Sequence, residues 1–395
     1  MKVLISGAGP VGLTAALVLA RAGVPVTVFE RNGGLAEDLR ASTWHPATLD
    51  MMGRLGLIDD ILRAGLIARY TQHRDRKSGQ IAEFDMELLR GETDHPYRVQ
   101  YEQFKYARLV HRHLRAFPHA QIIFNAKVTS LTQTADAVTL TVDATDGPQT
   151  HRGDYVIGAD GAWGAVRQAM GVEFEGLTFP ERFFVATTTF DFSEVIDRLC
   201  FVNYLADIDE WLVLLRVLGS WRCLFPTGPG ESDEEILSDD RTEQRLQAVW
   251  PRAVRYETIH RTLYSVHQRV AARYRVGRVF LAGDSAHLNN PLGGMGMNGG
   301  LHDAINLAEK LIAIERREAS ESILDRYERQ RRPVAIDYIN ANTARNRKLM
   351  TERDPTERKK AQDELCRQAE NAITAKAFLM KSSMIEALRA SARIA

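Results

Sequence analysis

The chain has 395 residues, of which 45% are apolar and 26% charged. At about 150 residues per domain, this length predicts two or three domains with a large core. The 51 Lys and Arg residues balance the 51 Asp and Glu residues, which argues against a surface for nucleic acid or an anionic membrane. Three distant cysteines without a CxxC motif indicate a reducing compartment, which we expect to be the cytoplasm.

A glycine-rich turn, GAGPVG, lies near the start of the chain. An apolar run before it predicts a strand, and apolar residues at helical spacing after it predict a helix. In such a turn Gly7 permits the sharp bend, Gly9 lets backbone N–H groups approach a pyrophosphate, and Gly12 allows close packing of helix on strand. Gly7, Gly9 and Pro10 also interrupt the apolar helix that a secretion signal would need.

The next strand is predicted to end at Glu30, 23 positions after Gly7. A carboxylate at this place accepts hydrogen bonds from the ribose hydroxyls of an adenosine and disfavours a 2′-phosphate. The strand, turn, helix, strand and acid together predict a bound dinucleotide, NAD or FAD rather than NADP.

The rest of the chain alternates between helical and strand patterns. Residues 45–64 and 102–116 are predicted to be helical, and residues 69–85 to form a hairpin that turns at Ser78-Gly79. Strands are predicted within 120–143 and at 151–160.

Residues 180–230 alternate apolar and polar positions, which predicts an antiparallel sheet. Residues 276–284 return to a buried parallel-type strand, and from about residue 300 onward the pattern is helical and increasingly charged. The layout therefore predicts an α/β domain that is interrupted by a β-rich insert and followed by a helical tail.

Two later strand ends carry an acid in a glycine-containing turn. One strand ends at Asp160-Gly161, with Arg167 one helical turn later, and the other ends at Asp284 before a segment rich in glycine. Arg40 precedes one predicted helix and Gln103 begins another. In this order the motifs resemble those of the FAD-dependent aromatic hydroxylases, the group A flavin monooxygenases typified by p-hydroxybenzoate hydroxylase, over residues 1 to about 335.

The resemblance implies an α/β fold with a Rossmann-type FAD-binding domain, an inserted β-rich substrate domain and a C-terminal helical tail. The expected FAD-binding domain comprises residues 1–70, 98–172 and 270–315, the substrate domain residues 71–97 and 173–269, and the helical tail residues 316–395. The sequence departs from the family at two positions: Gly164 stands where Ser is frequent, and Ser285 where Ala is common.

The resemblance also implies roles for individual residues. Glu30 would bind the adenosine ribose, and Arg40 and Gln103 the diphosphate and ribityl region. Val128 would border the adenine, Asp160 and Gly161 would support flavin and the transient nicotinamide, and Asp284 would bond the middle of FAD. The full set expected to bind FAD is Gly7, Gly9, Pro10, Val11, Gly12, Glu30, Arg31, Arg40, Gln103, Val128, Asp160, Gly161, Asp284, Gly294, Gly296, Met297 and Asn298.

Residues 282–304 allow three interpretations. A metal site is disfavoured because His287 and His302 are 15 positions apart across a flexible glycine segment. A second phosphate loop is disfavoured because no acid follows at ribose distance. We favour a helix N-terminus, shaped by Pro291, whose backbone N–H groups at Met297 and Asn298 stabilise negative charge on a reduced flavin ring.

In this family the substrate sits between the flavin and the β-rich insert, so residues 203–226 are expected to line it. Tyr204 and Trp221 are candidates to flank an aromatic ring, and Arg216 and Arg222 to bind a carboxylate. The alternative, core aromatics and solvent-facing arginines, stays open at this stage.

The implied activity is that of a monooxygenase with tightly but non-covalently bound FAD. It would use NAD(P)H and O2 to hydroxylate a small aromatic or heteroaromatic substrate, phenolic or carboxylic, through a flavin hydroperoxide, in the breakdown of aromatic compounds or in secondary metabolism. The alternatives are a reductase or dehydrogenase on the same scaffold and a regulator that keeps FAD as a structural element. We expect a cytoplasmic monomer or homodimer without a metal and without a nucleic-acid or membrane partner.

Overall fold

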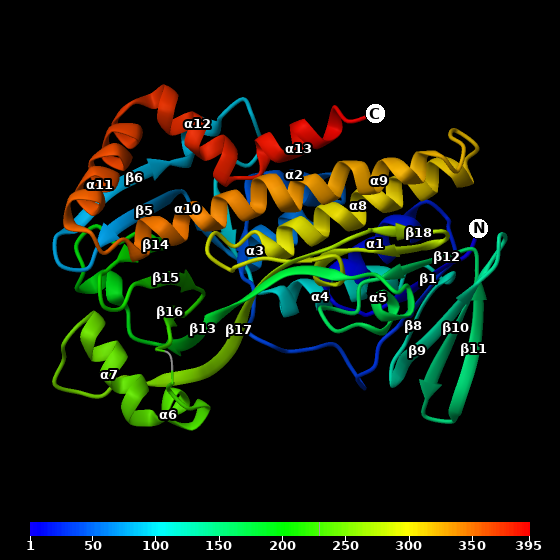
Figure 1. Cartoon of the computed structure of the whole chain (residues 1–395), viewed down its shortest axis with the longest axis horizontal. Coiled ribbons are helices and arrows are strands. Elements are labelled where there is room, and N and C mark those ends of the chain that lie inside the picture. Colours follow the sequence, from blue (N-terminus) through cyan, green and yellow to red (C-terminus); the bar gives the residue numbers. More distant parts are fainter. Residues whose placement is uncertain (229) are drawn as a thin grey trace.

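The structure is a computed structural model that describes residues 1–228 and 230–395, with the backbone alone at 339, 340 and 342. Figure 1 shows two β-rich regions, one at each end of the long axis, joined by long helices that run across the molecule. No helix of the described chain is long and apolar enough to cross a membrane.

A six-stranded sheet of order β18-β19-β12-β1-β2-β8 forms the centre of one half of the molecule. Its strands are β1 (Val3–Ser6), β2 (Val26–Phe29), β8 (Ala120–Ile123), β12 (Tyr155–Gly158), β18 (Arg275–Val276) and β19 (Val279–Leu281). All neighbours are parallel except the edge pair β18–β19. The carboxyl ends of β1, β2, β12 and β19 therefore meet at one edge, where open parallel sheets bind ligands.

Helices pack on this sheet and complete its core. They are α1 (Pro10–Arg21), α2 (Pro46–Arg54), α3 (Ile58–Ala64), α4 (Gln103–Leu114), α5 (Ala165–Ala169) and α8 (Gly296–Glu315). Two three-stranded sheets flank it: β3 (Thr43–Trp44), β7 (Arg98–Gln100) and β4 (Leu66–Ala68), and β9 (Ala126–Gln133), β10 (Val138–Ala144) and β11 (Gly147–Gly153). The helix α1 contacts both α4 and α8, so the first glycine turn and the later glycine-rich segment lie in one packed unit.

An eight-stranded sheet of order β20-β17-β13-β16-β15-β14-β5-β6 forms the other half. Its strands are β5 (Tyr70–Asp75), β6 (Gly79–Asp85), β13 (Phe174–Thr188), β14 (Val202–Ala206), β15 (Leu212–Val217), β16 (Ser220–Pro226), β17 (Thr258–Ala271) and β20 (His287–Leu288). The pairing is antiparallel except between β14 and β5. The short helical segments Met86–Leu89 (η1), Phe192–Glu194 (η2) and Gly283–Ser285 (η3) connect these elements.

The two faces of this sheet have different neighbours because side chains alternate along each strand. Phe184, Trp221 and Cys223 pack against α6 (Asp233–Leu237) and α7 (Asp239–Val249); we call this the outer face. Phe183 and Tyr204 pack with Leu292 and Met350 on the other side, which we call the inner face. The inner face is therefore the one that meets the glycine-rich segment.

The C-terminal helices cover the inner face and the β5–β6 hairpin (Figure 1). They are α9 (Ile323–Pro333), the π-helical turn Val334–Ile339 (η4), α10 (Asn340–Thr351), α11 (Pro355–Glu370), α12 (Ala372–Ser382) and α13 (Ile385–Ala392). The π-helical turn follows Pro333, whose missing N–H interrupts regular α-helical bonding. The tail thus packs on the half of the molecule that contains the eight-stranded sheet.

The predicted fold class, an α/β FAD-binding fold with a β-rich insert and a helical tail, is confirmed. Two local predictions differ from the structure. Residues 45–64 form two helices, because Gly56 adopts a left-handed φ of 56° between them. Residues 151–160 divide between β11 and β12 at Asp154, and the two strands belong to different sheets.

Candidate active site

The first glycine turn links the end of β1 to α1 and leaves the start of that helix open. Gly7 has a φ of 102°, and a Cβ there would lie 2.4 Å from the Ala159 carbonyl oxygen. A Cβ on Gly12 would lie 2.0 Å from the Gly7 oxygen, whereas one on Gly9 meets nothing within 4 Å. No side chain caps α1, which begins at Pro10. Free N–H groups beside open space at Gly9 are what a pyrophosphate requires.

Glu30 follows β2 and lies directly beside this turn. Its carboxylate accepts a hydrogen bond from the Ala8 N–H at 2.9 Å and from the Asn32 N–H at 3.0 Å. Arg31, the next residue, is exposed to solvent. The Glu30 carboxylate thus lies at the carboxyl end of β2, beside the turn at which the first motif would bind a dinucleotide.

Asp160 ties three strand ends together. It accepts hydrogen bonds from Ser6 Oγ at 3.0 Å, from the Val166 N–H at 3.2 Å and from Ser285 Oγ at 3.0 Å. Burial raises its pKa, and these donors oppose that rise. Gly161 has a φ of 84°, as its tight turn requires. Because its carboxylate already accepts these bonds from protein groups, Asp160 is built to hold the turns in place.

Asp284 has a different environment from Asp160. Its side chain is exposed, yet desolvation by the surrounding protein raises its pKa, while the charges of His287 and Arg40 act to lower it. An accessible carboxyl group surrounded by protein lines a recess. Within the described chain it has no hydrogen-bond or ion-pair partner, so it is available to a ligand hydroxyl.

Arg40 and Gln103 come to this recess from the segment before α2 and from the start of α4. Arg40 is exposed and pairs with Asp38 at 3.2 Å, and its charge acts on Asp284. The Gln103 N–H donates to the Ala41 carbonyl at 2.9 Å, which holds α4 against the Arg40 segment. Val128, on β9, is buried in the main core.

The glycine-rich segment forms a loop that opens α8. Gly293 and Gly294 have φ values of 117° and 67°, and the Gly294 N–H donates to the Pro291 carbonyl at 2.9 Å. The first α8 amide that donates a hydrogen bond within the described chain is that of Gly299, which bonds the Met295 carbonyl at 2.8 Å. The N–H groups of Gly296, Met297 and Asn298 have no partner among the described residues. They form the free N-terminus of a 20-residue helix.

The side chain of Asn298 fixes this loop to the segment before α2. Its Oδ1 accepts from the His45 N–H at 3.0 Å, and its Nδ2 donates to the Thr43 carbonyl at 2.9 Å. The His45 Nε2 lies 2.8 Å from the Gly293 carbonyl oxygen. Burial lowers the His45 pKa well below its usual value, so the ring is neutral and donates this bond. The backbone of Asn298 thus faces a potential ligand while its side chain is structural.

A buried ionic network supports the loop from behind. Asp303 accepts hydrogen bonds from Arg331 Nε at 2.7 Å and from the Gly283 N–H at 3.1 Å, and His287 Nε2 lies 2.7 Å from the same carboxylate. Burial alone would raise the Asp303 pKa, but the charges of His287 and Arg331 lower it. His302 bonds Thr48 Oγ1 at 2.8 Å instead. Asp303, His287 and His302 are therefore used to hold the loop, whereas Asp284 is not.

The predicted substrate residues divide between the two faces of the eight-stranded sheet. Tyr204 lies on the inner face and stacks on His73, with ring centroids 5.1 Å apart. Arg222 is buried and donates to the carbonyls of Leu39 and Arg40, so it supports the Arg40 segment.

The expectation for Arg216 and Trp221 is not met by the structure. Both side chains lie on the outer face and bind Asp191, Arg216 at 2.8 Å and Trp221 through Nε1 at 2.9 Å. The alternation of β15 and β16 turns these two residues away from the glycine-rich loop. They therefore drop out of the set of substrate candidates.

Sequence reasoning missed residues that reach the inner face from other segments. Arg98 on β7 is 3% exposed, and His73 on β5 is 5% exposed. Phe378, from the C-terminal tail, contacts His73 and Phe84 at ring centroid distances of 6.0 and 4.1 Å. No local motif marks these residues, because only the packing of the tail on the sheet brings them together.

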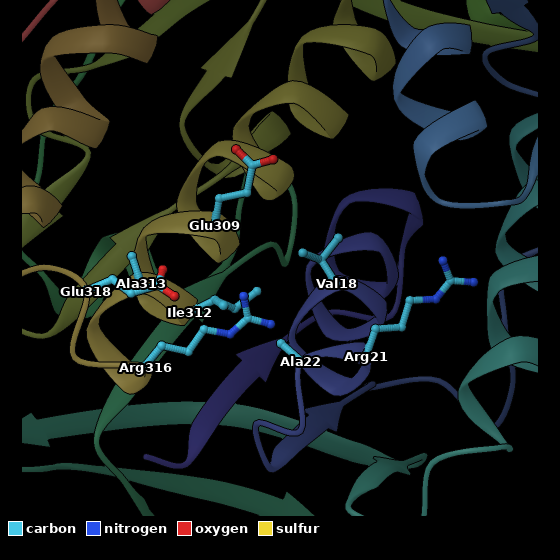
Figure 2. A pocket seen from close by; sticks show the side chains of 8 residues that line it. All are labelled: Val18, Arg21, Ala22, Glu309, Ile312, Ala313, Arg316 and Glu318. Atoms are coloured by element: carbon cyan, nitrogen blue, oxygen red, sulfur yellow. The ribbon is translucent and has the colours of Figure 1, made fainter.

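A separate pocket of about 350 Å³ lies at the far ends of α1 and α8. Figure 2 shows its lining, which includes Val18, Arg21, Ile312 and Arg316. It lies at the opposite end of α1 from the glycine turn, and its basic side chains are balanced by Glu309 and Glu318. This pocket is distinct from the site described above.

Comparison with known proteins gives the same result from sequence and from structure. The family profile described as "FAD binding domain" matches residues 1–342. Para-nitrophenol 4-monooxygenase of Pseudomonas sp. strain WBC-3 is 34% identical over 90% of this chain and 89% of its own length. The 6-hydroxy-3-succinoylpyridine 3-monooxygenase of Pseudomonas putida strain S16 is 32% identical over 91% of each chain.

Solved structures extend the likeness to the fold and the cofactor. The crystal structure of p-nitrophenol 4-monooxygenase from Pseudomonas putida matches with a TM-score of 0.92, 33% identity and 97% coverage of both chains. A ternary complex of aklavinone-11 hydroxylase with FAD and aklavinone matches with a TM-score of 0.78 and 27% identity, over 89% of this chain and 69% of that one. The open cradle at Gly9 and the unpartnered Asp284 fit FAD.

Proposed function

Because this chain belongs to the FAD-dependent aromatic hydroxylases, the group A flavin monooxygenases, we propose that it hydroxylates a small phenolic ring with NAD(P)H and O2. The single observation that carries the proposal is the meeting of the open N-terminus of α8 with the aromatic inner face of the sheet. Leu292, from the loop, packs in one cluster with Tyr204 and Phe183. A flavin ring held at the start of α8 would therefore face the aromatic side chains of this cluster.

Each part of the site has a separate task in this proposal. The amides around Gly9 bind the pyrophosphate, and Glu30 accepts from the ribose. Arg40, Gln103 and Asp284 hold the diphosphate and the ribityl chain. These residues would hold the cofactor, along its whole length, across the carboxyl ends of β1, β2 and β19.

FAD, when bound, takes electrons from NAD(P)H and activates O2, so the protein needs no acid–base triad for that chemistry. The chain contributes charge stabilisation and exclusion of water. The free N–H groups of Gly296, Met297 and Asn298 stabilise negative charge at the reduced ring. Apolar side chains around Leu292 and Met350 keep water from the reacting atoms.

The test is substrate-stimulated oxidation of NAD(P)H by the purified yellow protein, scored together with O2 uptake and product mass. We expect a panel of phenols to yield a product heavier by one oxygen atom, with one O2 consumed per product. NAD(P)H oxidation that reduces a substrate without adding oxygen would instead identify a reductase or dehydrogenase on this scaffold. Protein that purifies without FAD and does not take it up would contradict the proposal.

We further propose that the enzyme works in the cytoplasm as a monomer or homodimer, with small molecules as its partners rather than nucleic acid or a membrane. Three free cysteines support a reducing compartment, and the balanced charge supports small-molecule partners. Size measurement in solution tests the oligomeric state.

A further inference from the structure

Arg98 differs from the other deeply buried arginines of the described chain. Arg331 pairs with Asp303, and Arg245 pairs with Glu210 and Glu231. Arg222 donates to two backbone carbonyls. Among the described residues, Arg98 makes one hydrogen bond, from Nη2 to the Ser382 carbonyl at 3.5 Å, and its Nε and Nη1 are both buried without a partner. No carboxylate of the described residues forms an ion pair with it. Arg167 also makes one hydrogen bond and no ion pair, but its guanidinium lies over the Phe174 ring.

A buried guanidinium without an anion is costly, since desolvation is not offset by a charge partner. Native proteins rarely keep such a group, and each case calls for a physical reason. A ligand that brings the missing negative charge provides that reason.

The position of Arg98 places it near the glycine-rich loop and the inner face. It lies on β7, which pairs with β3 immediately before His45. Its charge acts on His45, which is bonded to Gly293, and on His73, which lies against Tyr204. Arg98 therefore lies near both the glycine-rich loop and the inner face of the sheet, close enough for its charge to act on a histidine of each.

The side chains around His73, on which the charge of Arg98 acts, are aromatic. Tyr204 stacks on His73 at an interplanar angle of 20°, and Phe378 from α12 meets the edge of the same imidazole. Burial is the main cause that lowers the pKa of His73 to about 3, and the charges of Arg345 and Arg98 act in the same direction. The His73 ring is therefore neutral. His45 Nδ1 is also buried without a partner. The region thus combines flat aromatic side chains with the positive charges of Arg98 and Arg345.

We propose that Arg98 binds an oxyanion carried by the aromatic substrate and selects ionised substrates over neutral ones of the same shape. The proposal deepens the proposed function and rests on it for the location of the cofactor ring. A guanidinium offers parallel N–H donors, which suit a carboxylate through two bonds and a phenolate oxygen through one or two. Ser382, from the tail, accepts the hydrogen bond from Arg98 Nη2 and leaves Nε and Nη1 for the oxyanion.

The binding test compares three FAD-loaded proteins: wild type, Arg98→Gln and the control Arg69→Gln. Arg69 is a suitable control because its side chain is exposed and pairs with Asp85. Three probes are titrated at pH 8.5 while the flavin spectrum is recorded: 4-nitrophenol, 4-hydroxybenzoate and the neutral 4-nitroanisole. We expect Arg98→Gln to weaken binding of an anionic probe at least tenfold, with less than a twofold change for 4-nitroanisole. The control should behave as wild type.

The two anionic probes show which group Arg98 binds. Weaker binding of 4-nitrophenol to Arg98→Gln would identify a phenolate, and weaker binding of 4-hydroxybenzoate would identify a carboxylate. Equal weakening of anionic and neutral probes, or no weakening, overturns the proposal. So does a wild type that prefers 4-nitroanisole or binds neither anion. Flavin content and O2-coupled hydroxylation test the proposed function separately. If the enzyme hydroxylates neutral phenols, the proposal for Arg98 fails, but the protein still binds FAD and still hydroxylates its substrate.

A thermal measurement on Arg98→Met checks the physical premise without relying on catalysis. Removing an unpaired buried charge should leave the Tm of the substrate-free, FAD-loaded protein unchanged or higher. The anionic probe should raise the Tm of wild type and not that of Arg98→Met. A Tm lower by several degrees in substrate-free Arg98→Met would mean that Arg98 is already satisfied within the fold, and would overturn the proposal.

Discussion

Ser285 donates a hydrogen bond of 3.0 Å to Oδ1 of Asp160, and this bond joins two turns that lie 125 residues apart in the chain. A Cβ on Gly164 would lie 1.9 Å from the same Oδ1 atom. The two departures of this sequence from its family therefore meet at one oxygen. A side chain at 164 would displace the carboxylate that Ser285 holds.

We predict that Gly164→Ser and Ser285→Ala are coupled. Gly164→Ser should lower stability by about 1–3 kcal/mol, because it forces Asp160 from its rotamer. Ser285→Ala should cost about 1 kcal/mol for the lost bond. The double variant should be less destabilised than the sum, since both changes act through one atom. Urea unfolding at a fixed FAD concentration measures the stability of the two single variants and the double variant. Additive losses of stability would contradict the coupling.

Replacing Glu30 with alanine should weaken FAD binding by roughly tenfold or more. The change removes the expected ribose acceptor and also the bond from the Ala8 N–H that shapes the glycine turn. Equilibrium dialysis of flavin gives the dissociation constant. Glu318→Ala, at an exposed site by the pocket at the far end of α1, serves as the control. Unchanged flavin affinity in Glu30→Ala would remove Glu30 from the cofactor site.

Asp303→Asn should destabilise the fold by about 3–5 kcal/mol, because it leaves Arg331 buried without its anion. Flavin content should fall with stability, since Asp303 also accepts from the Gly283 N–H beside Asp284. Chemical denaturation provides the measurement. Asp325→Asn, which breaks the more exposed pair with Arg275, should cost under about 1 kcal/mol. A similar loss in both variants would argue against a special role for the buried network.

Stability should fall as pH drops below about 6.5, in part through His302. Burial, with the charge of Arg331, lowers its folded-state pKa to about 3, whereas in the unfolded chain it titrates near 6.5. The unfolded state therefore binds more protons across this window, and unfolding is favoured by up to about 1.4 kcal/mol per pH unit for one such histidine.

The variant His302→Gln keeps a hydrogen-bonding group near Thr48 and removes the titration. Its stability should depend less steeply on pH than that of wild type between pH 6.5 and 5, measured by denaturant unfolding at several pH values. The pKa of His73 is also lowered, so His73 should still contribute to the pH dependence of stability in this variant. Parallel slopes in the two proteins would rule out His302 as a contributor.

The sequence by itself determined the cofactor and the class of chemistry. The requirements of a tight turn and a free helix N-terminus are local, so Gly7, Gly9 and Glu30 could be found from their spacing alone. The later acids, Asp160 and Asp284, could be found because each ends a short buried strand. Their order along the chain identified the family, and the comparisons confirm it.

Only the tertiary structure decided which residues lie on the face of the sheet that meets the glycine-rich loop. Alternation along β15 and β16 separates two faces but does not tell which one meets the loop, so Arg216 and Trp221 were predicted on the wrong side. His73 and Arg98 come from neighbouring segments, whereas Phe378 lies about 300 residues later in the chain and meets His73 only because the tail packs on the sheet. Local spacing specifies backbone geometry, whereas burial of a charge depends on long-range packing that no short motif encodes.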